Sequence, residues 1–194
     1  MSRWEWRTFG PGSGAGGRRL AAFEPDRVEE SDETYVLAPG SDASVKVRDG
    51  RIDVKHLLRV DEDGLEQWTP VLKEPFPLSP QDARLVLESL GADDPPERGA
   101  GTLDELVAAS AGPVAVAVHK HRAHYTIGGC MAELTEIRCA SGTVRTMAIE
   151  AEDPERVRAV VRELGVGDRP VACMARGLKA LVGITSPAPP SARG

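Results

Sequence analysis

Charged and apolar residues alternate one for one along several short stretches of the chain, beginning with RWEWRTF at residues 3–9. Arg3, Glu5 and Arg7 alternate there with two tryptophans. Because successive side chains of a β-strand point to opposite faces, this period of two predicts a strand with one charged face and one apolar face.

The same alternation occurs in five later stretches of the sequence, and each predicts a further strand with one charged face. The opposite faces of these strands carry mainly Val, Ile and Met. The charged positions are Lys46 and Arg48; Asp53 and Lys55; Lys120, Arg122 and His124; Glu136 and Arg138; and Glu150 and Glu152.

Turn and helix signals lie between the predicted strands. The sequence RDG at residues 48–50 predicts a hairpin turn. Ser79 followed by Pro80 predicts a helix that ends at Gly91. Further helices are expected over residues 102–109, 154–165 and 172–183, a flexible loop over 10–17, and a mixture of short helix and turn over 17–30. The order of strands, helix, strands and helix predicts an α+β fold with a mostly antiparallel sheet.

Length and composition place limits on the class of protein. A chain of 194 residues with 41% apolar residues is expected to form one domain with its own core, over residues 1–183. The Pro- and Ser-rich tail at residues 184–194 is expected to be disordered. The net charge of -6 argues against a general binder of nucleic acid duplexes or membrane surfaces.

Cysteine usage and the N-terminal sequence predict the compartment. The three cysteines are widely spaced and include no CxxC pair, which is typical of reduced thiols. The N-terminus has no apolar segment of the secretory type, and no run approaches the roughly 20 apolar residues of a membrane span. We therefore expect a cytoplasmic protein, and a homodimer is left open.

The pattern alone does not decide how the predicted sheet is arranged. Period-two alternation by itself favours an open antiparallel sheet with one solvated face. However, the polar faces hold many Arg, Lys and Glu and few Ser or Thr, and the predicted helices could cover the apolar faces. A closed barrel with a charged interior satisfies both details. Charges inside such a barrel need counter-charges, water, metal ions or a polyanionic ligand.

The order of these motifs resembles the CYTH, or triphosphate tunnel metalloenzyme, family. RWEWRTF stands where that family has an ExExKF strand, and SVKVR where it has LRxR. VHKHRAHY resembles its KxRxxY strand, AELTEI an acidic strand, MAIEAED an FxEIE strand, and GLKALVG its final Leu-rich helix. The resemblance spans about residues 3 to 183. It implies a closed or nearly closed antiparallel β-barrel with helices packed outside.

The resemblance also implies a function and a set of site residues. The function would be metal-dependent hydrolysis of a triphosphate-bearing small molecule or inorganic polyphosphate, held in a tunnel lined by Lys and Arg. The implied catalytic residues are Glu5, Glu136 and Glu150. The implied substrate-binding residues are Arg7, Lys46, Arg48, Lys55, Lys120, Arg122 and Arg138. Glu5, Glu150 and Glu152 would hold Mg²⁺ or Mn²⁺.

Two departures from the family pattern keep other functions open. Arg3 stands where the family has the first glutamate of ExExK, and Ala148 stands where it has the first glutamate of ExE. The alternative is therefore a module that binds a nucleotide, polyphosphate or phosphorylated metabolite without turnover. An activity like that of class IV adenylate cyclases is a further alternative. A third alternative is an open sheet that uses its apolar faces to bind protein partners.

Overall fold

The computed structural model describes residues 1–10, 14–93 and 95–185. Residues 11–13 of the predicted loop and all but the first two residues of the predicted disordered tail therefore lie outside the described residues. The strands are β1 (Arg3–Gly10), β2 (Arg27–Ala38), β3 (Ser41–Arg48), β4 (Arg51–Val60), β5 (Glu66–Pro75), β6 (Val114–Ile127), β7 (Cys130–Cys139) and β8 (Gly142–Ala151). The helices are α1 (Gly14–Leu20), α2 (Pro80–Ser89), α3 (Leu103–Ala108), α4 (Pro154–Leu164) and α5 (Met174–Val182).

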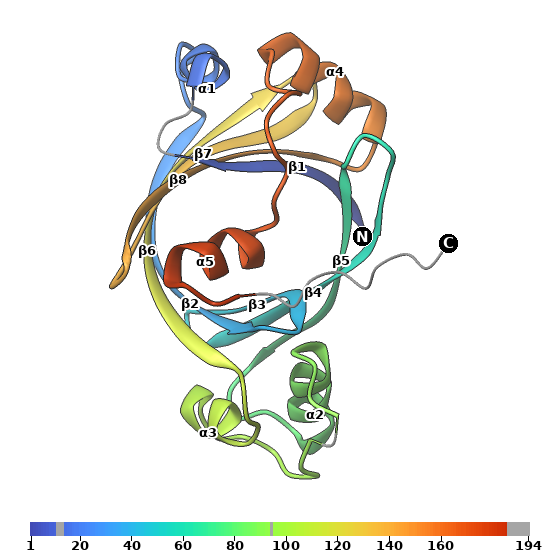
Figure 1. Cartoon of the computed structure of the whole chain (residues 1–194), viewed down its shortest axis with the longest axis vertical. Helices are drawn as coiled ribbons and strands as arrows, with labels where there is room; N and C mark the ends of the chain where they lie inside the picture. The colour runs from blue at the N-terminus through green and yellow to red at the C-terminus, as the bar shows by residue number, and fades with distance from the viewer. Residues whose placement is uncertain (11–13, 94, 186–194) are drawn as a thin grey trace.

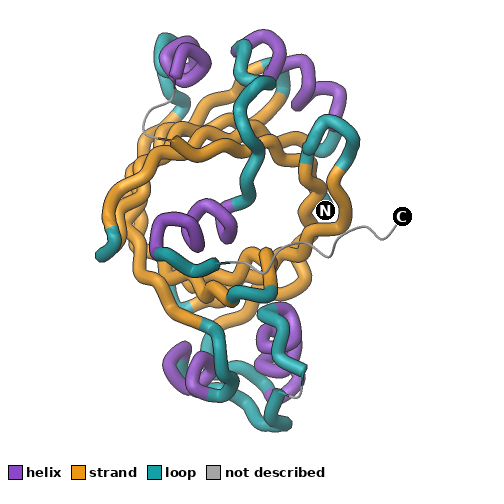
Figure 2. Tube along the Cα trace, in the orientation of Figure 1, coloured by secondary structure: helices purple, strands orange, loops and turns teal. Residues whose placement is uncertain are grey.

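The strands form a closed antiparallel barrel in the order β1-β5-β4-β3-β2-β6-β7-β8 (Figures 1 and 2). The ring closes where β8 pairs with β1, with Glu150 opposite Glu5. The predicted barrel is thus confirmed, and an open sheet is excluded. Along the described part of the chain, no helix is both long enough and apolar enough to cross a membrane.

Local sequence signals produce several of the predicted boundaries. The two-residue turn between β3 and β4 consists of Asp49 and Gly50, with φ angles of 52° and 71°. Positive φ at both central residues is the requirement of a tight hairpin turn. Helix α2 begins where the Ser79 side chain accepts a hydrogen bond from the backbone N–H of Asp82. Helix α4 ends at Gly165, which has a left-handed φ of 61°.

The segment before β2 differs from the prediction. We expected a mixture of helix and turn up to residue 30, but β2 begins at Arg27, and α1 lies further upstream. The first half of β2 is mostly polar, and β2 pairs with β6 from Arg27 to Leu37. This extension brings the acidic residue Glu29 into the barrel sheet, upstream of Glu33 on the same strand.

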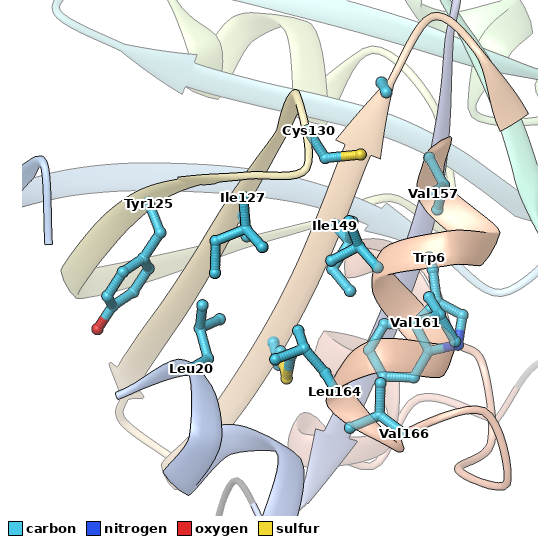
Figure 3. Close-up of a cluster of buried hydrophobic side chains, with 14 of the residues drawn as sticks. Trp6, Leu20, Tyr125, Ile127, Cys130, Ile149, Val157, Val161, Leu164 and Val166 are labelled. Atoms are coloured by element: carbon cyan, nitrogen blue, oxygen red, sulfur yellow. The ribbon is translucent and has the colours of Figure 1, made fainter. Parts of the chain in front are cut away.

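Helices cover two sides of the barrel from outside. Trp4 and Trp6 of β1 are buried against Val157 and Leu164 of α4, as Figure 3 shows for Trp6, and Leu20 of α1 joins the same cluster. On the other side, α2 and α3 cover the outward-facing apolar residues of β3 and β4, among them Val45, Ile52 and Val54. The tryptophans of the first strand therefore pack under an outer helix, as the alternation predicts.

Helix α5 lies within the ring of strands in Figure 1, a position that the sequence did not predict. Its apolar side, including Leu178, packs against inward-facing residues such as Tyr35 and Ile137. Lys179 of α5 is buried and donates to Oδ1 of Asp42 at 2.7 Å. The barrel interior is thus apolar where α5 enters it and charged elsewhere.

Gly177 provides a test of how tightly α5 fits the barrel. A Cβ atom at this position would lie 2.3 Å from the ring of Phe9, which is too close without a shift of the helix or the ring. We expect Gly177→Ala to lower the free energy of unfolding by about 1–3 kcal/mol, despite the better helix propensity of alanine.

Urea denaturation of Gly177→Ala beside Gly40→Ala checks this expectation. Gly40 has open space around its Cα, so its variant controls for the added methyl group. Equal stabilities of the two variants would show that α5 is loosely seated.

Candidate functional site: the charged interior of the barrel

A cavity of about 440 Å³ lies inside the barrel, within the size range of small-molecule sites. Of its charged lining residues, six are basic and four are acidic. The basic residues are Arg3, Arg7, Lys46, Lys55, Lys120 and Arg122, and the acidic residues are Glu5, Asp53, Glu133 and Glu150. The basic residues come from β1, β3, β4 and β6, so the barrel brings together charges from distant parts of the chain.

Most residues proposed from the sequence for this site line the cavity. These are Glu5, Arg7, Lys46, Lys55, Lys120, Arg122 and Glu150. Arg48 is the next residue after Lys46 on the same face of β3, and its side chain is 41% exposed. Its Nη1 lies 3.7 Å from Oε1 of Glu33. It therefore lies next to the charge network of the cavity, outside the lining itself.

Three proposed residues lie elsewhere. Glu136 and Arg138 face outward from β7, where Glu136 accepts hydrogen bonds from Arg138 and from Arg145 of β8. Their expected place in the tunnel was wrong, because Glu133 is the β7 carboxylate that lines the cavity and residues three apart on a strand face opposite ways. Glu152 is exposed beyond the end of β8, so its expected place beside Glu150 was also wrong.

Glu33 of β2 is the centre of the buried charge network, and it is absent from the site residues expected from the sequence. Its side chain has no exposed surface, and it accepts hydrogen bonds from Nζ of Lys120 at 2.9 Å and from Nη2 of Arg122 at 3.2 Å. The Tyr35 hydroxyl also donates to it. Burial opposes ionisation of Glu33, but Lys120, Lys46 and Arg122 outweigh that effect and lower its pKa to about 2.

Lys120 pairs with Glu33 and is nearly as deeply buried. Its side chain is 2% exposed, and Nζ also donates to the Tyr35 hydroxyl at 2.6 Å. Burial lowers the pKa of Lys120 to about 8, although the charge of Glu33 opposes the shift. At neutral pH the ammonium group is therefore charged, with Glu33 as its counter-ion.

Arg7 holds two carboxylates of the cavity at once. Its Nε and Nη2 donate to the two oxygens of Glu5 at 2.9 and 3.3 Å, and Nη1 donates to Glu133 at 2.9 Å. Nη1 also donates to the Thr146 hydroxyl at 3.3 Å. Burial opposes ionisation of Glu133, but Arg7, Arg122 and Lys120 lower its pKa to about 2. The guanidinium of Arg7 thus links β1 with β7.

Ala148 lies between the residues that Arg7 connects. In the strand register it stands directly opposite Arg7 on one side and Glu133 on the other. It is a buried methyl group at the position where the resemblance implied a carboxylate. Because the side chain is so short, the Arg7 guanidinium can reach across it to Glu133.

Glu5 and Glu150 form the other acidic part of the cavity. They are directly opposite each other on β1 and β8. Burial, together with the negative charge of Glu5, raises the pKa of Glu150. Arg3 donates to Glu150 at 3.3 Å, so each of these carboxylates is in contact with an arginine.

The donor set does not fit a protein-held metal ion. Mg²⁺ and Mn²⁺ require oxygen ligands that are free to coordinate. Both oxygens of Glu5 are bonded to Arg7, and Glu133 and Glu150 also face arginines. Over the described ranges, no group of three or more His, Cys, Asp or Glu side chains is arranged to hold a metal. The predicted ligand set of Glu5, Glu150 and Glu152 is not assembled.

Comparison with solved structures confirms the fold of the resemblance. The chain superposes on the Hippeastrum protein HpAC1, a candidate adenylyl cyclase described as having a dominant triphosphatase activity, with a TM-score of 0.54 and 16% identity. The match covers 95% of this chain and 98% of that one. The PH1012 protein of Pyrococcus horikoshii OT3 matches with a TM-score of 0.49 and 16% identity, over 90% and 98% of the two chains.

Comparison at the level of sequence does not identify a family for the chain. No family model matches the chain. The chaperone protein ClpB 2 of Parasynechococcus marenigrum is 36% identical over 84 residues, which is 42% of this chain and 9% of the chaperone. The chain thus corresponds to only a small part of that relative. What the comparisons establish is the fold, a closed barrel of the triphosphate tunnel type.

The buried position of Glu33 predicts a large loss of stability on its neutralisation. We expect Glu33→Gln to lower the free energy of unfolding by about 3–5 kcal/mol, because Lys120 and Arg122 would lose their buried counter-ion. Urea denaturation measures the change. Glu30→Gln, an exposed residue of the same strand, is the matched control and should stay within about 0.5 kcal/mol of the wild type. Similar losses in both variants would contradict the central role of Glu33.

The lowered pKa values of Glu33 and Glu133 predict a loss of stability in acid. The stabilisation from a carboxylate with a lowered pKa is complete above its ordinary value of 4.5 and is lost as the pH falls towards its folded pKa of about 2. We expect a loss of about 2 kcal/mol for each carboxylate between pH 7 and pH 3. Glu66 and Glu150 have raised pKa values, so they take up protons at higher pH, and their protonation stabilises the folded state. The test is the urea concentration at the unfolding midpoint, measured as a function of pH. A midpoint that stays constant as the pH is lowered below 4 would contradict the lowered pKa values of Glu33 and Glu133.

Proposed function

We propose that the barrel interior binds the polyphosphate group of a small molecule, such as a nucleoside triphosphate, or inorganic polyphosphate. The observation that carries this proposal is the convergence of six basic side chains from four strands in one cavity. Lys and Arg are the residues that bind phosphate oxygens, and a partly enclosed cavity strengthens their attraction for an anion.

Two features indicate that the basic residues are not used up by internal pairing. Nε of Arg122 is buried and makes no hydrogen bond among the described residues, although it faces Oε2 of Glu133 at 3.5 Å. The hydroxyl of Thr135, opposite Arg122 in the strand register, also makes no hydrogen bond there. A buried N–H group without a hydrogen bond is costly, so a ligand oxygen at a shorter distance from Nε would stabilise the site. Among the described residues, Lys55 of the cavity wall makes no salt bridge, and it is available to a ligand.

Metal-dependent hydrolysis of the bound triphosphate is the second candidate, and it requires Mg²⁺ or Mn²⁺ to displace Arg7 from Glu5 and Arg3 from Glu150. The adjacent position of these two carboxylates favours it. The triphosphatase activity described for HpAC1 agrees with it at the level of the fold. The contacts of Arg3 and Arg7 with the same carboxylates favour binding without turnover. A cyclase-like activity, a cytoplasmic location and a homodimer remain predictions from the sequence.

Thermal unfolding with tripolyphosphate, ATP and thiamine triphosphate separates the two candidates, if released phosphate and pyrophosphate are assayed in the same wells. A ligand at about 100 times its Kd should add about 2.7 kcal/mol to the free energy of unfolding. Stabilisation without product release identifies a binding module, and stabilisation with metal-dependent release identifies an enzyme. No stabilisation by any of these anions would refute the proposed function.

Lysine substitutions test which residues hold the ligand. We expect Lys55→Met and Lys46→Met each to weaken tripolyphosphate binding about 10- to 100-fold, because each removes one charged donor to phosphate. Isothermal titration calorimetry measures the Kd. Arg138→Gln, on the outer face of β7, removes a positive charge without touching the cavity and should leave the Kd nearly unchanged. A uniform effect of all three variants would indicate long-range attraction in place of a defined site.

A further inference from the structure

Three of the four acidic residues of the cavity, all except Asp53, are held by an arginine of the same cavity. Glu5 is bonded through both oxygens to Arg7, and Glu133 is bonded to the same guanidinium. Glu150 accepts from Arg3 at 3.3 Å. These three carboxylates come from β1, β7 and β8, which are neighbours in the barrel.

Arg7 has the position and the contacts that a bound cation would have. It is 7% exposed, and its guanidinium lies between Glu5 and Glu133, in contact also with the Thr146 hydroxyl. A positive charge surrounded by two carboxylates and a hydroxyl oxygen is the environment that oxygen-liganded cations require. The short side chain of Ala148 leaves the space through which the guanidinium reaches Glu133.

A divalent ion entering this region would have to displace Arg7 from Glu5 or from Glu133. A buried arginine without its carboxylate partner is strongly unfavourable. Mg²⁺ also gives up its water ligands reluctantly, so it competes poorly with a preformed bidentate ion pair. The remaining basic residues of the wall, including Lys46, Lys55 and Arg122, still face the cavity and can hold an anion.

We propose that the cavity binds its polyphosphate ligand without a divalent cation, because the guanidinium of Arg7 permanently occupies the place between Glu5 and Glu133. This inference rests on the proposed function and adds to it the cation requirement of the site. The ligand is then held by protein cations alone. A free divalent ion acts against binding, since it forms a complex with the polyphosphate in solution.

Calorimetric titration of the full chain with tripolyphosphate, in EDTA and in excess Mg²⁺, tests the proposal. The expected result is a Kd in EDTA equal to or lower than the Kd with Mg²⁺. A Kd that is higher in EDTA than in Mg²⁺ overturns it while leaving the proposed function intact; a tenfold rise is equivalent to ~1.4 kcal/mol. No binding in either buffer refutes the proposed function itself.

A variant with a metal readout tests the role of Arg7 independently of any phosphate. Arg7→Gln leaves Glu5 and Glu133 facing each other without the guanidinium. We expect Mg²⁺ or Mn²⁺ to raise the unfolding temperature of this variant but not that of the wild type. The control is Arg145→Gln, which removes an exposed arginine from the outer face of β8. Equal responses of wild type and Arg7→Gln would show that Arg7 does not occupy a cation position, and if Arg7→Gln does not fold, the titration in EDTA still decides.

Discussion

Four basic side chains from β3 and β6 approach the buried carboxylate of Glu33, and this convergence makes a charged barrel interior possible. Positive charges so close together would otherwise repel one another in a poorly solvated space. The pairing continues from Arg122 to Glu133, and from there to Arg7 and Glu5. A chain of ion pairs therefore connects β2, β6, β7 and β1 through the interior. The basic residues of this chain of ion pairs are therefore held in place by protein carboxylates, and such preorganisation lowers the cost of binding an anion.

Much of this arrangement could be predicted from the sequence, because strand alternation assigns side chains to faces. Arg3, Glu5 and Arg7 share the inner face of β1, and the tryptophans between them pack under α4. The charged composition of the polar faces weakened the case for an open sheet, and the order of the motifs then favoured the closed barrel. Strand pairing itself was not predictable from single stretches. The opposition of Glu5 and Glu150 results from barrel closure between the first and last strands.

The misplacement of Glu136 has a physical origin, which is that the inner face changes character along the barrel. Where α5 enters, the inward residues are apolar, and Ile137 is one of them. Taking Ile137 as an outward residue placed Glu136 inside, whereas Glu133 faces the cavity. No local signal marks α5 as an inner helix, because its apolar side would serve equally well against an outer face. Glu33 was missed because the polar start of β2 does not alternate with apolar residues.

Barrel closure has a consequence for how the chain reaches this structure. The first strand is bonded to the last, so contacts such as those of Trp6 with Ile149 connect residues far apart in the sequence. Folds dominated by such distant contacts fold slowly, because the conformational entropy of a long loop is lost before the stabilising contacts form. During synthesis, the second edge of β1 stays unpaired until β8 has been made. Charged side chains on an unpaired edge discourage association with another chain, and β1 carries Arg3, Glu5 and Arg7 at alternate positions.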